Sequence, residues 1–364
     1  MHRARNIVLV IAFLAVLLAP AVGGVFHLNP LGKIDEKRVL AKKPEVAPWS
    51  REGLRQLPIL AQAWDKYFSE NFGFRKLLIG TYRLATFYVL RTSPNPAVVR
   101  GESDGERRWL YFDASVTKDG VGLESILGQR PYIPAELAAI AEQLRQASAA
   151  VSARGAKLVI AVYPDKQTIY PEYLPRDKRP RPGTVSRLDQ FWAMAADLGG
   201  VALLDLRAPL LQAKAEAQLY YPSDTHWNWR AGLLAYQAMA RAIERQDAQW
   251  SVLPVAHVRW VLGPPLVGDL MDLMGVPAIG GDRDWLPVVE SPPGTVRPKH
   301  GKLLVITDSF FELVQPFFAL QFEQIKKLYR TRDARRTLLT TQLLDTEKPD
   351  VVMLASVERY WTMD

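Results

Sequence analysis

The fold class follows from one short stretch, Lys157-Leu158-Val159-Ile160-Ala161-Val162. This run is continuous, apolar after its first residue and rich in β-branched side chains, which is typical of a strand buried on both faces of a sheet. Similar runs occupy residues 201–206, 302–307 and 351–355. Residues 134–153 and 185–198 carry apolar side chains at helical spacing and are followed by glycines. This alternation predicts an α/β fold with a mainly parallel sheet flanked by helices.

Length and composition describe an ordinary globular protein. The 364 residues exceed the usual span of one hydrophobic core, so a main domain with a smaller companion is expected. A net charge of +8 could attract a polyanion or an anionic membrane, but the basic residues are scattered and are not interleaved with aromatics, so we expect no nucleic-acid partner. The absence of cysteine excludes disulfides, thiolate metal sites and a Cys nucleophile.

The N-terminus has the features of an export signal. Arg3 and Arg5 precede an apolar run from Ile7 to Val25, whose length is near that needed to span a bilayer. The arginines predict that the N-terminus stays in the cytoplasm and that the rest is exported. We therefore expect residues 1–27 to anchor a periplasmic protein in the inner membrane, with a cleaved signal peptide as the alternative.

The remaining chain separates into three parts. Residues 28–50 are rich in Lys and Pro and predict a tether. Residues 51–108 predict a helical N-terminal segment, broken at Asn71-Phe72-Gly73 and followed by a stop at Ser93-Pro94-Asn95-Pro96. Residues 109–364 then form the predicted main domain, which opens with an aromatic strand at 109–112.

One segment combines a carboxylate with an imidazole: Tyr220-Tyr221-Pro222-Ser223-Asp224-Thr225-His226-Trp227-Asn228-Trp229. In an extended segment Asp224 and His226 share one face, so the carboxylate can hold one imidazole nitrogen and leave the other free to accept a proton. A chance pairing is the alternative. The aromatic neighbours are candidate contacts for a sugar ring, with core packing as their alternative: Tyr220, Tyr221, Trp227 and Trp229.

A second segment offers a nucleophile: Val305-Ile306-Thr307-Asp308-Ser309-Phe310-Phe311. Ser309 follows an apolar strand and precedes an expected amphipathic helix, so its hydroxyl can be exposed at the carboxyl end of the sheet with backbone N–H groups available for an oxyanion. The alternative is that Asp308 or Ser309 only caps the helix. Together the two segments supply a nucleophile, a base and an orienting carboxylate at one rim of the sheet.

Other chemistries have weaker support in the sequence. No His-x-x-x-His or His-Glu-x-x-His pair is present, so we expect no metal site. No glycine-rich phosphate loop follows a strand, so we expect no nucleotide cofactor.

Several blocks share their order and spacing with a known family: residues 67–75, 93–96, 109–112, 164–172, 224–227, Gly268-Asp269-Leu270 and 307–310. From about residue 60 onward the chain resembles the SGNH-hydrolase-like domain of the alginate O-acetyltransferases and their exported relatives. The resemblance implies that Asp224, His226 and Ser309 form a catalytic triad. The order Asp, His, Ser reverses that of ordinary SGNH hydrolases, and Thr307 stands where they carry Gly, so only the Ser309 N–H is named as an oxyanion donor.

The resemblance also implies an acetyl relay. A membrane-bound O-acyltransferase would deliver acetyl groups to Ser309, and the enzyme would pass them to hydroxyls of an exported polysaccharide within a complex of polymer synthesis and secretion. Two alternatives stay open: an extracytoplasmic carbohydrate acetylesterase with the same triad, and a non-catalytic subunit of the secretion complex.

Overall fold

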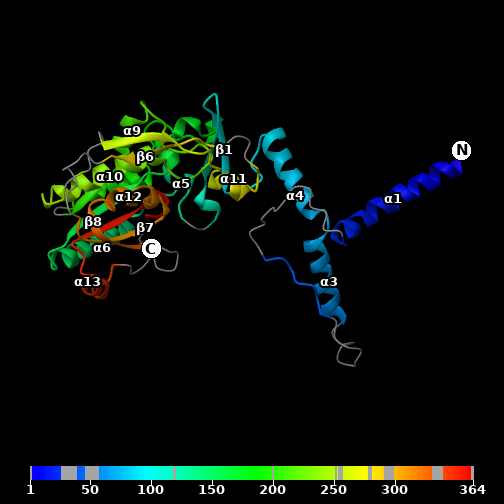
Figure 1. Cartoon of the computed structure of the whole chain (residues 1–364), viewed down its shortest axis with the longest axis horizontal. Coiled ribbons are helices and arrows are strands. Elements are labelled where there is room, and N and C mark those ends of the chain that lie inside the picture. Colours follow the sequence, from blue (N-terminus) through cyan, green and yellow to red (C-terminus); the bar gives the residue numbers. More distant parts are fainter. Residues whose placement is uncertain are drawn as a thin grey trace. The chain divides into compact units, whose positions relative to one another are not determined.

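The structure is a computed structural model that describes residues 2–25, 39–45, 57–117, 120–198, 201–250, 252, 257–277, 281–290, 299–329 and 339–361. The chain divides into two compact units. Unit 1 comprises Met1–Pro94 with Met274–Pro277, and unit 2 comprises Asn95–Leu273 with Ala278–Asp364. Many elements of both units are labelled in Figure 1.

The regular secondary structure described in unit 1 is helical. It contains α1 (His2–Val25), α3 (Leu57–Asn71), α4 (Arg75–Leu84) and a π-helical turn, η1 (Ala85–Val89). In α3 the rings of Trp64 and Phe68 stack with their centroids 5.2 Å apart, as side chains four residues apart on one helix face can. The described part of the predicted helical segment 51–108 contains α3, α4 and η1, with a break after Asn71, and also a strand at Val98–Ser103. Residues 51–56 and most of the predicted tether lie outside the described residues.

The apolar run predicted as a membrane anchor forms α1. Within the described part of the chain, no helix combines the length and the apolar character required to cross a membrane. The predicted membrane anchor is thus not confirmed.

Unit 2 is built on a sheet that, among the described residues, has five strands in the order β4-β3-β9-β7-β8. The strands are β3 (Lys157–Tyr163), β4 (Ala202–Asp205), β7 (His300–Thr307), β8 (Phe322–Tyr329) and β9 (Val351–Val357). All neighbouring pairs run parallel. The predicted α/β fold with a mainly parallel sheet is confirmed, and the four apolar runs read from the sequence are strands β3, β4, β7 and β9.

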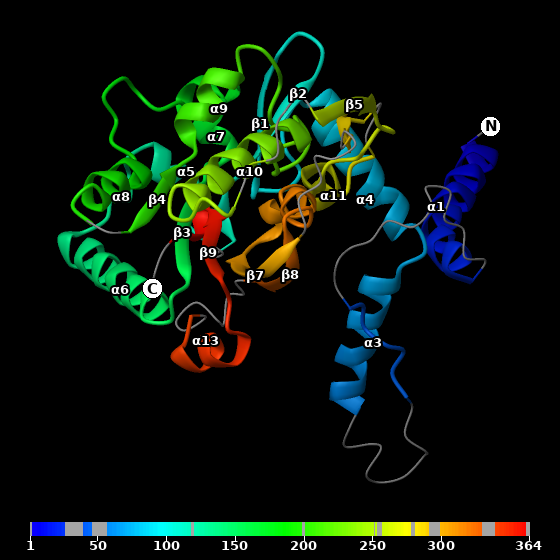
Figure 2. The same cartoon turned by 60° about the vertical axis from the view of Figure 1, so that its left-hand side comes forward.

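Helices cover both faces of this sheet (Figure 2). One face packs against α6 (Pro134–Ser152) and α8 (Arg187–Ala195) through a cluster that includes Leu144, Ile160, Phe191 and Val352. The other face packs against α10 (Trp229–Glu244) and α12 (Gln315–Phe318) through a cluster that includes Val159, Tyr236, Phe318 and Met353. Because neither face meets water, the central strands are apolar throughout rather than alternating.

Smaller elements surround the sheet. Two antiparallel ribbons pair β1 (Val98–Ser103) with β2 (Arg108–Phe112) and β5 (Val258–Leu262) with β6 (Trp285–Val289). Short helices are α5 (Leu123–Ile126), α7 (Lys166–Ile169), α9 (Arg207–Ala213), α11 (Asp269–Met274) and α13 (Thr341–Glu347). Unit 2 begins at Asn95, whereas the predicted domain boundary lies between residues 108 and 109.

The segment after Ser309 differs from the expected amphipathic helix. It forms a 3-10 turn, η6 (Ser309–Leu313), followed by the four-residue α12 with Pro316 in its first turn. Proline has no N–H to donate, so it fits only the first turn of a helix. The nucleophile candidate therefore opens a tight turn.

Candidate active site

Three predicted residues meet in one hydrogen-bonded chain. His226 Nδ1 lies 2.7 Å from Asp224 Oδ1, and His226 Nε2 lies 2.7 Å from Ser309 Oγ. With the proton on Nδ1 donated to the carboxylate, Nε2 can accept the proton of the serine hydroxyl. The three side chains therefore have the geometry of an orienting acid, a base and a nucleophile.

A tight loop, rather than the extended segment assumed from the sequence, places Asp224 and His226 together. Tyr220 and Trp227 form an antiparallel bridge that closes the loop. Inside it the His226 N–H donates to Asp224 Oδ1 at 2.8 Å, so the carboxylate fixes the backbone as well as the ring. Asn228 then caps α10 by accepting from the N–H groups of Arg230 and Ala231. The loop is held at both ends.

Asp308 takes the capping role that the sequence left open between it and Ser309. Its Oδ1 accepts from the Phe310 N–H at 3.0 Å, and its Oδ2 accepts from the Val357 N–H at 2.6 Å. The turn is thus fixed to the end of β9, while Ser309 is exposed and its hydroxyl is free to meet His226. The imidazole packs against the Phe310 ring, with centroids 4.8 Å apart.

The local electrostatics favour an ionised Asp224. Burial alone would raise the pKa of its carboxyl, but the hydrogen bond and positive charge of His226 and the N–H donated by Asp269 lower that pKa to about 2. Asp269 behaves in the opposite way. Partial burial and the nearby charge of Asp224 raise the pKa of Asp269, whose side chain keeps 42% of its surface exposed.

A buried lysine makes hydrogen bonds to the backbone of this loop. Lys166 Nζ donates to the backbone carbonyls of Tyr221 at 3.0 Å, Pro222 at 3.2 Å and Asp224 at 2.6 Å. Burial lowers the pKa of Lys166 to about 8. Because an ammonium has three protons to donate, its hydrogen-bonding capacity is used entirely on the loop that carries Asp224 and His226.

A second charged cluster lies behind the site. The guanidinium of Arg359 pairs with the buried carboxylate of Asp165 and lies 5.4 Å from the Phe310 ring centroid. Glu358 Oε2 accepts from the Asp165 N–H at 3.1 Å and from the Thr168 hydroxyl at 2.6 Å. Burial and the charge of Asp165 raise the pKa of Glu358 to about 8, so this carboxyl is neutral near pH 7.

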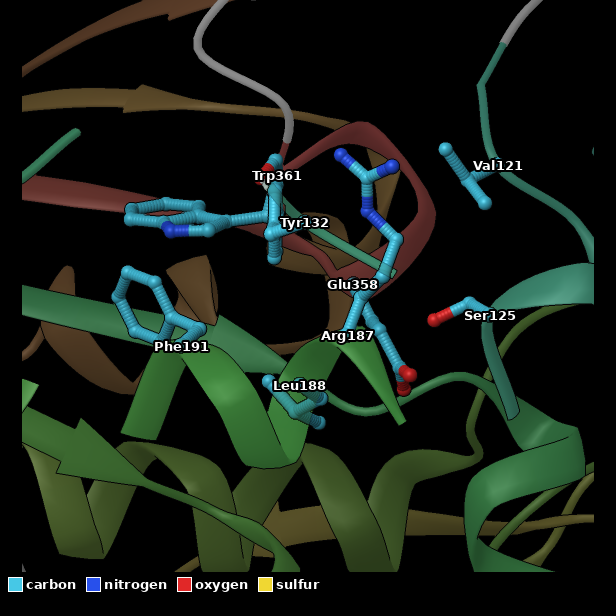
Figure 3. Close-up of a pocket in the computed structure, with 8 residues that line it drawn as sticks. All are labelled: Val121, Ser125, Tyr132, Arg187, Leu188, Phe191, Glu358 and Trp361. Carbon is cyan, nitrogen blue, oxygen red and sulfur yellow. Dashed lines mark hydrogen bonds between the residues drawn. The ribbon is translucent and has the colours of Figure 1, made fainter. Parts of the chain in front are cut away.

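A pocket beside this cluster is separate from the triad. Figure 3 shows its lining: Val121, Ser125, Tyr132, Arg187, Leu188, Phe191, Glu358 and Trp361. None of the three triad side chains lines it, so it does not serve as the cavity over Ser309.

Most of the aromatics predicted to contact substrate are core residues. Tyr220 and Trp227 are fully buried and Tyr221 is 6% exposed. Trp227 donates to the Phe310 carbonyl at 3.0 Å, and the Tyr221 hydroxyl donates to Asp284. Trp229 is half-buried and makes an edge contact with Phe317. The three buried rings have no face to offer a sugar, and the core-packing alternative describes them.

Asp224, His226 and Asp269 also have donor atoms that lie within 4.8 Å of one another and could hold a metal ion. The imidazole nitrogen close to both carboxylates is Nδ1, which lies 2.7 Å from Asp224 Oδ1 and 3.6 Å from Asp269 Oδ2 and is hydrogen-bonded to Asp224. A metal there would displace the Nδ1 proton, so metal binding and the triad arrangement exclude each other.

Sequence reasoning assigned no role to Lys166 or Asp269, although both lie in blocks that carry the family resemblance. A usable signal was Gly268. A Cβ on this residue would lie 2.1 Å from the Ser223 carbonyl oxygen, so only glycine allows the turn before Asp269 to approach the catalytic loop.

Comparison with known proteins places the site within a family. The family described as "SGNH hydrolase-like domain, acetyltransferase AlgX" matches residues 103–309, which include Asp224, His226 and Ser309.

Curated relatives resemble part of the chain. A probable alginate O-acetylase AlgJ of Pseudomonas putida is 30% identical over 188 residues, 52% of this chain and 44% of that protein. A probable alginate O-acetylase AlgJ of Pseudomonas syringae pv. tomato is 25% identical over 246 residues, 68% of this chain and 54% of that protein. The chain thus spans about half the length of these relatives.

Among solved structures, Bacillus cereus PatB1 with a sulfonyl adduct has a TM-score of 0.51 at 13% identity, covering 74% of this chain and 99% of that one. This likeness shows a shared fold.

Proposed function

Because the chain belongs to the family of SGNH hydrolase-like acetyltransferase domains typified by AlgX, we propose that it is a polysaccharide O-acetyltransferase that carries the acetyl group on Ser309. The observation that supports this function is the hydrogen-bonded chain from Asp224 through His226 to Ser309. The acceptor we propose is alginate or a similar exported polysaccharide, in accordance with the names of the AlgJ relatives.

In the first half-reaction, His226 Nε2 takes the proton of the Ser309 hydroxyl as Oγ attacks the carbonyl carbon of an acetyl donor. A C–O bond to Ser309 forms, the bond between the acetyl carbon and the leaving group breaks, and the imidazolium returns the proton to the leaving group. Asp224 holds the ring tautomer and stabilises the imidazolium. The Ser309 N–H is the oxyanion donor we name.

In the second half-reaction a sugar hydroxyl gives its proton to Nε2 and attacks the acetyl carbon. The ester bond to Ser309 breaks, and the serine oxygen recovers the proton from the imidazolium. Water could replace the sugar in this step, which would make the protein an acetylesterase. We place the reaction in the periplasm, with a membrane-bound O-acyltransferase supplying acetyl groups within a polymer synthesis and secretion complex.

The test supplies purified protein with p-nitrophenyl acetate and an alginate oligosaccharide, and mass spectrometry then follows acetylated sugar and free acetate. Ser309→Ala should lower transfer by about 10³-fold or more, because the group that carries the acetyl is lost. Ser103→Ala changes another exposed serine of unit 2 and serves as the matched control. Acetate release without sugar acetylation would assign an esterase, and full activity of Ser309→Ala would overturn both functions.

Addition of EDTA separates the triad from a metal site. Activity that survives the chelator fits a serine nucleophile. Activity that is lost and restored by Zn²⁺ would instead assign the Asp224, His226 and Asp269 group to a metal-activated water.

A further inference from the structure

Asp269 makes hydrogen bonds to the loop that carries Asp224 and His226, through both its backbone and its side chain. Its N–H donates to Asp224 Oδ2 at 2.8 Å. Its Oδ1 accepts from the Thr225 N–H at 2.7 Å, and its Oδ2 accepts from the Thr225 hydroxyl. That same Oδ2 lies 3.6 Å from His226 Nδ1. Asp269 therefore hydrogen-bonds directly to Asp224 and lies close to the His226 ring.

Thr225 links this carboxylate to the imidazole. Its Oγ1 lies 3.2 Å from His226 Nδ1. Because a hydroxyl has one proton and Thr225 donates it to Asp269, only lone pairs remain to face the ring N–H. The Nδ1 proton thus has two acceptors, Asp224 Oδ1 at 2.7 Å and Thr225 Oγ1 at 3.2 Å. A ring held by two acceptors has less freedom to rotate away from Ser309 than a ring held by one.

We propose that Asp269 is a positioning residue of the active site: through the Thr225 hydroxyl and the Asp224 carboxylate, it holds the His226 ring with Nε2 facing Ser309. This inference rests on the proposed function, in which Ser309 is the nucleophile. Asp269 touches neither acetyl group nor sugar in this scheme. Its charge also faces the imidazolium that forms when the serine proton is transferred, so it stabilises the same state as Asp224.

The approach of Asp269 is built into the backbone. Gly268 N–H donates to Ser223 Oγ at 3.2 Å, and any side chain at 268 would collide with the Ser223 carbonyl. The Thr225 hydroxyl bond to Asp269 therefore depends on a turn that only glycine permits.

Asp282 provides a matched control, because it makes hydrogen bonds to the same loop at Ser223, farther along the chain from His226. Asp282 Oδ2 accepts from the Ser223 N–H at 2.9 Å and from the Ser223 hydroxyl at 2.7 Å. Asp282 thus accepts from the N–H and the hydroxyl of one loop residue, as Asp269 does, although Asp282 uses one oxygen for both bonds and Asp269 uses two. Within the described residues, the hydrogen bonds of Asp282 reach neither His226 nor Asp224.

The experiment compares Asp269→Asn with Asp282→Asn in the full chain. One readout is the rate at which phenylmethylsulfonyl fluoride modifies Ser309, followed by intact mass, and the other is steady-state acetyl transfer from p-nitrophenyl acetate. Asp269→Asn keeps the backbone bond to Asp224 and loses the charge, so labelling and kcat should fall about tenfold to a hundredfold while KM changes little. Asp282→Asn should keep both rates near wild type.

Thr225 variants test the linkage. Thr225→Val should slow labelling as Asp269→Asn does, and Thr225→Ser, which keeps the hydroxyl, should restore it. A double variant with Asp269→Asn and Thr225→Val should be labelled only slightly more slowly than either single variant, because both changes break the same link.

Three outcomes would overturn the inference. The first is that Asp269→Asn is labelled at the wild-type rate. The second is that Asp269→Asn and Asp282→Asn lose labelling rate equally and in proportion to their loss of thermal stability. The third is that Thr225→Ser is labelled as slowly as Thr225→Val. Failure of Ser309 as the nucleophile has a different signature: wild-type protein would then not be labelled at Ser309 at all.

Discussion

Asp224 and Glu358 are both largely buried carboxyls at one end of the sheet, yet near pH 7 Asp224 is ionised and Glu358 is neutral. Asp224 accepts from three donors, the His226 N–H, the His226 ring and the Asp269 N–H, and its pKa is about 2. Glu358 receives its donors on one oxygen only and lies near the Asp165 carboxylate, and its pKa is about 8. Burial raises the pKa of both carboxyls, and the hydrogen-bond donors and neighbouring charges decide whether that effect is overcome, as at Asp224, or reinforced, as at Glu358.

The largest effect should come from removing the charge of Asp224, the ionised carboxyl. Asp224→Asn presents an amide where the carboxylate was, which disfavours the tautomer with the proton on Nδ1. Acetyl transfer should fall about 10³- to 10⁴-fold in kcat with the fold intact. Kinetics and circular dichroism measure the two quantities, and a loss of the folded spectrum would show that Asp224 is needed mainly for structure.

The next largest effect should come from the charged cluster behind the site. Arg359→Met leaves the buried Asp165 carboxylate without its guanidinium and should lower the free energy of unfolding by about 3–5 kcal/mol. Urea titration with tryptophan fluorescence measures it. Adding Asp165→Asn removes the stranded charge and should recover much of that loss. Equal instability of the single and double variants would contradict this account.

Lys166 connects the catalytic loop to this region and should have an intermediate effect. Lys166→Met deprives three loop carbonyls of their donor and should lower the free energy of unfolding by about 2–3 kcal/mol, measured in the same urea titration. Lys214→Met is the control, since Lys214 donates to one carbonyl and to Glu172 at the protein surface. A Lys214 variant as unstable as the Lys166 variant would contradict the assigned support of the loop.

The last effect depends on pH and concerns the neutral carboxyl. Folded Glu358 keeps a proton that the unfolded chain releases above its ordinary pKa of 4.5, so its stabilising contribution is complete below pH 4.5 and is lost as pH rises to about 8. Glu358→Gln keeps an acceptor oxygen for Asp165 and Thr168 and has no proton to lose.

At about pH 8 the Glu358→Gln variant should be more stable than wild type by up to about 4 kcal/mol, and near pH 4 the difference should vanish. Thermal unfolding across this range measures both. A variant that is less stable than wild type at every pH would show that the carboxyl is charged in the folded protein.

The sheet could be predicted wherever its strands are enclosed. Strands β3 and β9 are continuous apolar runs because helices cover both faces, and such runs stand out in a sequence. Strand β8 was not predicted. It lies at the edge of the sheet and carries Lys326 and Lys327, which are typical of exposed edge strands but weaken the apolar signal.

The site could be predicted to the extent that its chemistry is local. Asp224 and His226 lie two residues apart, and Ser309 ends an apolar strand. The roles of Lys166 and Asp269 depend on contacts with Asp224 across 58 and 45 residues of sequence. Residue type and spacing carry no information about such contacts, so these roles needed the folded chain.

The strand order bears on how the protein folds. Strand β9 comes last in sequence among the sheet's strands but lies at its centre, so Lys157 of β3 pairs with Val351. Such a high contact order predicts slow folding, and until β9 has been synthesised both β3 and β7 expose an open edge. Because the Val357 N–H also holds Asp308, the turn that presents Ser309 is completed only when β9 inserts. A nascent or truncated chain without this strand should therefore be inactive and prone to aggregate.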